Sequence, residues 1–292
     1  MENLMNKVAV ITGAASGIGK SIAKKCALEG MKLVLADTNE ERLKETDLEL
    51  KNLTENVLSL KIDVSDRKDI EVLAHKCLEK YGEVHILFNN AGISIGGPIW
   101  EKSVEEWDSV FRVNINGIFY TVKIFIPIML KQDTECLIIN TSSGFGLIAD
   151  GGIYGVTKHA VTALSEILSY ELFQIKSKIK IKVIIPGFTL TNIGDTERNK
   201  LSNLDYEKMP FEARELLKRR IKYREMMFSR ALHPDDVAES VIRGIKDDRF
   251  YIFHDPYLKI YVKRRFKRIL TALRTQYIYD KNHAKKQHLA SY

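Results

Sequence analysis

Short apolar runs alternate with longer amphipathic segments along most of this chain. Many of the apolar runs are continuous, as expected of strands buried on both faces of a parallel sheet. Alternation of such strands with helices implies right-handed crossover connections. The pattern therefore predicts an α/β fold: a doubly wound parallel sheet of about seven strands with helices on both faces. The predicted strands are Lys7–Thr12, Lys32–Asp37, Val57–Ile62, Val84–Asn89, Cys136–Ser143, Ile179–Ile185 and Arg249–His254.

Polar or glycine-containing positions close six successive predicted strands. In an open α/β sheet the ligand crevice lies at the carboxyl ends of the strands. These positions are therefore expected to meet at a single site. They are Thr12-Gly13, Asp37, Asp63, Asn89-Asn90, Ser143 and Pro186-Gly187.

The first of these ends opens a glycine-rich turn, Thr12–Gly19, with the sequence TGAASGIG. Gly13, Gly17 and Gly19 permit a tight turn and close approach of the backbone to a pyrophosphate. Ser16 and Ile18 lie where the next helix begins, so their N–H groups can face an anion. The turn predicts dinucleotide binding, although a glycine-rich turn can also be purely structural.

Asp37 lies 18 residues after Gly19, at the end of the second strand. A carboxylate there can bind the adenosine ribose hydroxyls and would repel a 2′-phosphate. The alternative is that Asp37 is the N-cap of the next helix.

Two later strand ends add candidate cofactor contacts. Asp63 is placed to accept a hydrogen bond from the adenine amino group, with Val64 covering the ring, although an N-cap role for Asp63 is equally compatible. Asn90, followed by two small residues, is expected to touch the cofactor, and Asn89 is expected to be structural.

Tyr154 and Lys158 are four residues apart in YGVTK, so they share one face of a helix. A phenol beside an ammonium group is an acid–base pair, because a neighbouring cation favours the phenolate. Taken alone, the spacing is also common on ordinary helices.

Together these motifs resemble the short-chain dehydrogenase/reductase family, in its shorter TGxxxGxG and YxxxK subgroup. The resemblance runs from about Lys7 to Pro256 and rests on TGAASGIG, NNAG, Asn114, NTSS, YGVTK and PGFT in the family's order. It implies a Rossmann-type domain that binds NAD or NADP. It also implies hydride transfer between the nicotinamide and a secondary alcohol or ketone.

The resemblance assigns a role to each matching residue. Tyr154 is the general acid in carbonyl reduction and the general base in alcohol oxidation. Lys158 lowers the pKa of Tyr154 and, with it, contacts the nicotinamide ribose. Ser143 binds the substrate oxygen, and Asn114 holds a water that links Lys158 to solvent.

The last cofactor contacts implied by the resemblance follow the sixth strand. Pro186 and Gly187 shape the nicotinamide pocket, and Thr189 reaches toward the carboxamide.

Two departures from the family pattern affect this reading. Ser143 precedes Tyr154 by 11 residues, about two fewer than is commonest, so Ser142 remains a rival for the serine role. Strand alternation would aim the two serines at opposite faces, and Gly146 favours Ser143. No Arg or Lys occurs at Ala14–Ser16 or directly after Asp37, which favours NAD over NADP.

The expected organisation is a catalytic domain over residues 1–256 followed by a C-terminal extension over 257–292. Within the domain, residues 192–231 match the position of a mobile substrate lid. Phe145, Ile148 and Ile153 are expected to line an apolar pocket. The extension predicts a basic amphipathic helix, Tyr257–Arg274, and a flexible tail from Lys281.

Charge is concentrated in that extension. The chain carries +7 overall, but residues from Tyr251 onward carry +8, so the remainder carries −1. A nearly neutral body argues against nucleic-acid binding. Peripheral membrane contact through the basic helix is the less favoured alternative to packing on the body or on a neighbouring subunit.

Several classes of site are not indicated by the sequence. Three cysteines without a CxxC motif and a start without a signal-peptide core favour the cytoplasm, and no metal-ligating cluster is identified. The apolar run Gly117–Leu130 is shorter than a membrane span and predicts a buried helix.

Two further expectations concern assembly and class. The helices around Val104–Leu130 and Tyr154–Phe173 carry more apolar residues than one sheet contact covers, which predicts a homodimer or homotetramer. A covering role for the C-terminal helix is the alternative. An oxidoreductase acting on a small, apolar alcohol or carbonyl compound is favoured over a dinucleotide sensor without turnover, because a sensor has no need of Ser143, Tyr154 and Lys158.

Overall fold

The computed structural model describes residues 1–194, 215, 218, 222 and 231–289. A single sheet of seven parallel strands, in the order β3-β2-β1-β4-β5-β6-β7, forms its centre. This arrangement confirms the predicted Rossmann-type fold class. The strands are β1 (Val8–Thr12), β2 (Lys32–Asp37), β3 (Val57–Lys61), β4 (Ile86–Asn89), β5 (Cys136–Thr141), β6 (Ile179–Ile185) and β7 (Tyr251–Phe253).

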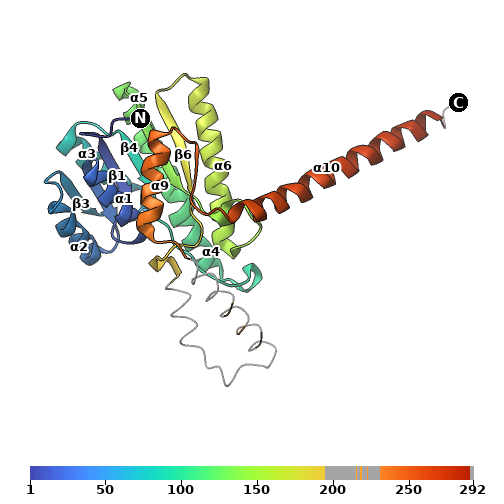
Figure 1. Cartoon of the computed structure of the whole chain (residues 1–292), viewed down its shortest axis with the longest axis horizontal. Coiled ribbons are helices and arrows are strands. Elements are labelled where there is room, and N and C mark those ends of the chain that lie inside the picture. The colour runs from blue at the N-terminus through green and yellow to red at the C-terminus, as the bar shows by residue number, and fades with distance from the viewer. Residues whose placement is uncertain (195–214, 216–217, 219–221, 223–230, 290–292) are drawn as a thin grey trace.

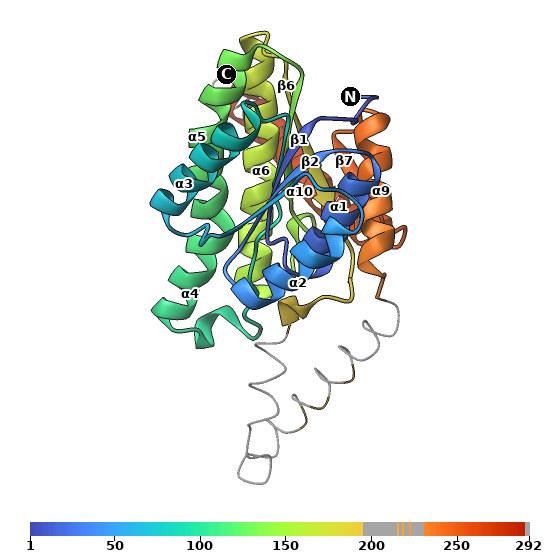
Figure 2. The same cartoon turned by 90° about the vertical axis from the view of Figure 1, so that its left-hand side faces the viewer.

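Helices cover both faces of the sheet (Figure 2). Alternate residues of one strand face opposite layers: Ala9 and Ile11 belong to one hydrophobic core, and Val8 and Val10 to the other. Burial on both faces explains why the strands are apolar without alternation. One layer contains α1 (Gly17–Leu28), α2 (Glu40–Lys51) and α9 (Pro234–Lys246), and the other α3 (Arg67–Tyr81), α5 (Gly117–Gln132) and α6 (Gly152–Gln174).

Strand β5 is shorter than the sequence pattern predicts. It ends at Thr141, so Ser142 and Ser143 leave the strand and lead into a single turn of 3₁₀-helix, η3 (Gly144–Gly146). The side chain of Ser143 caps this turn by accepting a hydrogen bond from Phe145 N at 3.2 Å. Local capping by the serine therefore ends the strand early.

One helical run is long and apolar enough to span a membrane by composition. It covers Val104–Gln132 and joins α4 (Val104–Phe111), the π-helix η2 (Arg112–Asn116) and α5. Within it, Phe125 and Met129 are buried in the core between the sheet and its helices. We therefore identify the run as a core helix, in line with the buried helix predicted for its second half.

The C-terminal helix α10 (Leu258–Leu289) leaves the body and projects away from it as a rod (Figure 1). It is longer than the predicted helix and continues past Lys281, where the sequence suggested a flexible tail. Of the predicted lid, the structure describes η4 (Asn192–Gly194), residues 215, 218 and 222, and residue 231. The rest of the lid lies outside the described residues.

Candidate functional site

The glycine-rich turn connects β1 to the N-terminus of α1. Gly13 and Gly17 have positive φ, and a Cβ at Gly19 would lie 2.0 Å from the carbonyl oxygen of Gly13. Ser16 is the N-cap of α1, but its side chain makes no capping hydrogen bond, and the first turn contains no acidic residue. The positive end of this helix is thus left for an external anion. These residues fit the pyrophosphate of a dinucleotide.

Hydrogen bonds join the glycine turn to the end of β4. Asn90 donates its side-chain amide to the carbonyl oxygens of Thr12 and Gly13, both at 3.2 Å. The Thr12 hydroxyl accepts from the N–H groups of Asn90 and Ala91 at 3.0 and 3.1 Å. Asn90 therefore holds the backbone of the glycine turn in place. Thr12 takes part in the same network, a role that the sequence analysis did not assign to it.

Asp37 lies beside the glycine turn, at the end of β2. Its two carboxylate oxygens accept hydrogen bonds from Ala15 N at 3.0 Å and Asn39 N at 2.9 Å. The N-cap of α2 is Asn39, which accepts from Arg42 N, so the alternative N-cap role for Asp37 was wrong. The carboxylate is instead fixed between the dinucleotide turn and the start of α2.

Asp63 and Val64 follow β3 but differ in exposure. Asp63 is exposed, and its carboxylate accepts from Ser65 N at 2.8 Å. The N-cap of α3 is Asp66, so the N-cap alternative for Asp63 is also wrong. Val64 is buried and packs close to Gly117, where an added Cβ would lie 2.9 Å from a Val64 methyl group.

The two serines after β5 face different partners. Ser142 is fully buried, donates to the carbonyl oxygen of Lys158 at 2.8 Å and lies 2.7 Å from the Thr162 hydroxyl. The Ser143 side chain lies close enough to Tyr154 to lower the pKa of its phenol. Ser142 therefore anchors α6, and Ser143 is the serine that meets the tyrosine. A Cβ at Gly146 would lie 2.3 Å from the Ser142 hydroxyl, which explains the glycine in this turn.

Tyr154 and Lys158 lie on the first turns of α6, against the end of β5. The Lys158 ammonium nitrogen is 5.4 Å from the centre of the Tyr154 ring. It donates a hydrogen bond of 2.7 Å to the carbonyl oxygen of Thr141. Thr141 therefore positions the lysine through its backbone, which leaves no side-chain signal in the sequence.

Burial controls the pKa values of this pair. It raises the pKa of Tyr154 to about 12, and the hydrogen bond with Ser143 opposes the rise. Burial also lowers the pKa of Lys158 to about 8. Burial and Ser143 are the causes of the shift in the Tyr154 pKa here, and a lowering by Lys158 stays a prediction. The ammonium group donates its hydrogen bond to Thr141 O, and a buried phenolate is costly to form.

Asn114 lies in the π-helical turn η2, between α4 and α5. Its side chain is fully buried, accepts from Ile93 N at 2.9 Å, and donates to Ile93 O at 3.0 Å and to the Thr157 hydroxyl at 2.9 Å. The asparagine oxygen and the Lys158 nitrogen lie 3.3 and 3.5 Å from the position that a Cβ on Gly92 would take. The π-helical turn thus places Asn114 close to Lys158. Such turns are frequent at functional sites.

The loop after β6 completes this edge of the sheet. Pro186 accepts a backbone hydrogen bond from Gly144 at 2.9 Å, which joins the loop to the turn that follows Ser143. A Cβ at Gly187 would lie 2.5 Å from an Asp255 carboxylate oxygen, and the Thr189 hydroxyl donates to Gly187 O at 3.1 Å. The predicted site residues of the glycine turn, β2, β4, β5, α6 and β6 therefore lie along one edge of the sheet.

Aromatic side chains border the serine and tyrosine. The Phe145 ring meets Tyr154 edge-on at 6.3 Å and Phe188 at 5.5 Å between ring centres. Phe188 was not singled out from the sequence. Ile153 is fully buried in the structure, and its place in the pocket lining stays a prediction.

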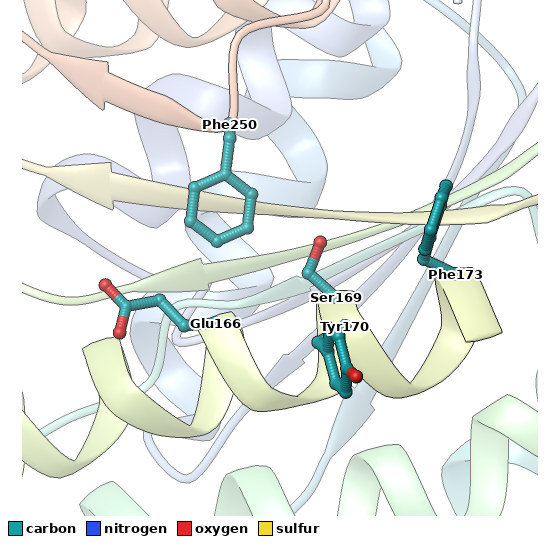
Figure 3. Close-up of a pocket in the computed structure, with 5 residues that line it drawn as sticks. All are labelled: Glu166, Ser169, Tyr170, Phe173 and Phe250. Atoms are coloured by element: carbon teal, nitrogen blue, oxygen red, sulfur yellow. The ribbon is translucent and has the colours of Figure 1, made fainter.

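A separate, open hollow lies on the far part of α6 and contains none of the predicted site residues (Figure 3). Phe250 faces α6 from the segment before β7, and Phe173 projects from α6 on the side of Phe250. Tyr170 also lines the hollow. Glu166 and Ser169 complete its lining.

Comparison with known proteins identifies the family. The model of the family described as short chain dehydrogenase matches residues 7–202. The chain belongs to this family. The match spans the glycine turn, Asn114, the serine turn and YGVTK, so every predicted site residue lies inside it.

Two relatives of this short-chain dehydrogenase cover most of its length. It is 31% identical over 273 residues to the CLA biosynthesis dehydrogenase/reductase of Lactiplantibacillus plantarum, covering 93% of this chain and 96% of that protein. It is 36% identical over 208 residues to an uncharacterized oxidoreductase of Staphylococcus saprophyticus, covering 70% of this chain and 88% of that protein.

Solved structures of the family include complexes with nicotinamide cofactors. A short chain dehydrogenase/reductase from Burkholderia phymatum in complex with NAD superposes with a TM-score of 0.83 at 38% identity, covering 93% of this chain and 97% of that one. The 3-ketoacyl-(acyl-carrier-protein) reductase of Brucella melitensis, complexed with NADH, gives 0.70 at 25% identity, covering 86% and 98%.

Proposed function

We propose that this short-chain dehydrogenase transfers a hydride between NAD and a secondary alcohol or ketone, with Tyr154 as the proton donor and acceptor. The observation that carries the proposal is the meeting of Ser143 with Tyr154 beside the buried Lys158, next to an open glycine turn. The bound dinucleotide would supply or accept the hydride. The chain's own residues would bind the substrate oxygen and move its proton.

In the direction of carbonyl reduction, Ser143 and Tyr154 donate hydrogen bonds to the substrate oxygen. The phenolic proton then passes to that oxygen as the carbonyl carbon gains the hydride. A raised pKa keeps Tyr154 protonated at neutral pH, which suits a general acid. In the reverse direction the phenolate accepts the alcohol proton, and the Lys158 ammonium stabilises that anion.

Asn114 is proposed to keep Lys158 in place and connected to solvent. Its oxygen and the lysine nitrogen both lie close to Gly92, with the asparagine held on two sides by Ile93 and Thr157. A water between them would carry protons to and from the lysine.

The proposed cofactor is NAD rather than NADP. The Asp37 carboxylate lies beside the glycine turn, where it can accept hydrogen bonds from the ribose hydroxyls and repel a 2′-phosphate. The remaining proposed contacts to the cofactor are Gly13, Ser16, Gly17, Ile18, Gly19, Asp63, Val64, Asn90, Tyr154, Lys158, Pro186, Gly187 and Thr189.

The aromatic rings of Phe145 and Phe188 beside Tyr154 support an apolar substrate. We place the enzyme in the cytoplasm, as three buried free cysteines suit a reducing compartment. We also propose a homo-oligomer, through the exposed apolar face of α5 and α6.

The test is a panel of secondary alcohols and ketones offered to the purified full chain with NAD(H) or NADP(H), followed at 340 nm as nicotinamide absorbance. We expect turnover with NAD(H) that disappears in Tyr154→Phe. If the protein binds NADH but turns over no compound of a broad panel, the dinucleotide-sensing alternative becomes the better account.

A further inference from the structure

Helix α10 has an unbalanced charge over the part whose side chains the structure describes, Leu258–Gln276. This part contains no Asp or Glu. Its cations are all on the helix surface, and Arg265 alone among them donates a hydrogen bond to the body, to Leu147 O at 3.3 Å. The cations are Lys259, Lys263, Arg264, Arg265, Lys267, Arg268 and Arg274.

An apolar stripe runs along one side of the same helix. Leu258, Val262, Phe266, Ile269, Leu270 and Leu273 follow the helical spacing that places side chains on one face. The stripe begins on the body, where Leu258 is buried and Val262 packs with it against β6. Farther along, Phe266, Ile269, Leu270 and Leu273 are 44–63% exposed. The stripe is therefore longer than the surface that the body offers.

The direction of α10 removes the body as a partner for this outer stripe (Figure 1). The body of a second copy offers little complementary charge to this helix. The residues before Tyr251 carry a net charge of only −1, whereas those from Tyr251 onward carry +8. Two copies of α10 would repel each other. A nucleic acid would account for the cations but not for the apolar stripe beside them.

We propose that α10 is an anchor that lies on an anionic lipid surface. Its apolar stripe would enter the boundary between headgroups and acyl chains, and the cations on either side would meet lipid phosphates. The combination of an exposed apolar stripe with flanking cations and no anions fits this partner on both counts. This surface lies apart from the dinucleotide site, and lipid binding by it is independent of the proposed reaction.

The test uses the full chain and sedimentation with lipid vesicles. We expect binding to vesicles of phosphatidylcholine with about a third phosphatidylglycerol, and at least tenfold weaker binding to pure phosphatidylcholine. Raising the salt to about 0.5 M should weaken binding to the anionic vesicles, because it screens the attraction. Equal binding to both vesicle types, or to neither, would overturn the proposal.

A pair of matched variants tests the apolar stripe. Leu270→Gln with Leu273→Gln should weaken binding to anionic vesicles at least tenfold, since two apolar side chains that would enter the lipid are lost without a change of charge. Thr271→Gln with Thr275→Gln places the same side chains on the polar face and should stay within about twofold of the parent. Equal loss in both pairs would overturn the assignment of the binding face.

A charge variant and two further measurements separate the rival partners. Lys267→Gln with Arg268→Gln should weaken anionic-vesicle binding more than tenfold, at about fivefold per charge. Vesicle binding that this variant leaves unchanged would contradict the proposal. A protein that binds no vesicles, and whose oligomer mass falls in the variant Leu270→Gln with Leu273→Gln, would also contradict the proposal. That result would indicate that the stripe contacts another subunit. Binding to a 20-base-pair duplex in place of vesicles would indicate a nucleic acid.

Discussion

The ammonium nitrogen of Lys158 lies 5.4 Å from the centre of the Tyr154 ring and gives its hydrogen bond of 2.7 Å to Thr141 O. The lysine thus stands near the phenol without bonding to it. Any lowering of the tyrosine pKa beyond the contribution of Ser143 must come from charge acting across this distance, together with the positive charge of an oxidised nicotinamide. Ser143 is the side chain whose interaction with the phenol lowers the pKa of Tyr154.

Removing the phenolic oxygen tests the proton-transfer role. Tyr154→Phe should reduce turnover by about a thousandfold, because general acid–base catalysis contributes on that order. The dissociation constant for NADH, measured by fluorescence titration, should change less than about threefold, since the ring remains. Retained turnover in this variant would falsify the assigned mechanism.

Cofactor choice can be tested at Asp37 with two substitutions. Asp37→Ala should narrow the preference for NAD over NADP in kcat/KM by about tenfold or more, a change of about 1.4 kcal/mol. Asp37→Asn is the control, because it removes the charge but keeps one acceptor oxygen for Ala15 N or Asn39 N. A parent enzyme that already prefers NADPH would show the inference to be wrong.

We expect the buried Lys158 to lower the free energy of unfolding. Its folded pKa of about 8 lies below the ordinary 10.5, so the buried ammonium destabilises the fold below pH 8. Lys158→Met should therefore raise the free energy of unfolding at pH 7 by about 2 kcal/mol while abolishing activity, after allowance for the lost bond to Thr141.

The pH dependence gives this prediction its sign. Between pH 8 and 10.5 the folded parent loses the lysine proton while the unfolded chain keeps it, so the parent gains stability as the pH rises. The advantage of Lys158→Met should shrink across that window in urea melts. Lys131→Met, at an exposed helical lysine, should show no such change; a constant or growing advantage of Lys158→Met would contradict the account.

A second buried lysine predicts a structural ion pair. Lys182 on β6 is 1% exposed and donates to Asp248 at 2.8 Å, while Lys180 binds the same carboxylate from the surface. Asp248→Asn should lower the free energy of unfolding by about 2 kcal/mol, because it leaves a buried cation without its anion. Asn tolerates the positive φ of this position, so the backbone is kept.

Lys180→Gln is the matched control for this pair, and its effect should stay below about 0.5 kcal/mol, as for exposed ion pairs. The lysines hold the pKa of Asp248 down at about 2. The carboxylate's contribution should therefore be complete above about pH 4 and be lost as the pH falls toward 2. Equal effects of the two variants in urea melts would rule out a special role for Lys182.

The strands and the glycine turn were predictable because their cause is local. Continuous apolar runs mark buried strands, and Gly13 and Gly19 stand where a Cβ would collide with neighbouring backbone. The choice of Ser143 as the partner of Tyr154 needed the joint spacing of the family motifs, because each serine taken alone fits several roles.

Other features could not be read from the sequence because no side chain marks them. The partner of Lys158 is a backbone carbonyl, and every residue carries one. The π-helical turn at Asn114 carries side-chain hydrogen bonds to Ile93 and Thr157, which lie far from it in the sequence. The direction of α10 depends on how few of its apolar residues find a surface on the body, and helical periodicity carries no information about that.

Assembly provides the last prediction, since α10 does not cover the apolar face shared by α5 and α6 (Figure 1). Phe119 on α5 and Ile167 on α6 are 49% and 56% exposed, and Phe125 is fully buried. Exposed apolar side chains on two adjacent helices favour a contact with a second copy, because water is then excluded from both faces. Light scattering should give a multiple of the 33.4 kDa chain mass.

Ile167→Glu should shift that mass toward the single chain, because a charge would be buried in the contact. Val72→Glu is the matched control: it adds the same charge at a 49% exposed valine on α3, outside the proposed contact, and should leave the mass unchanged. A parent protein that scatters as 33.4 kDa at micromolar concentration would sink the oligomer. An equal change of mass in the two variants would show that the contact does not depend on α6.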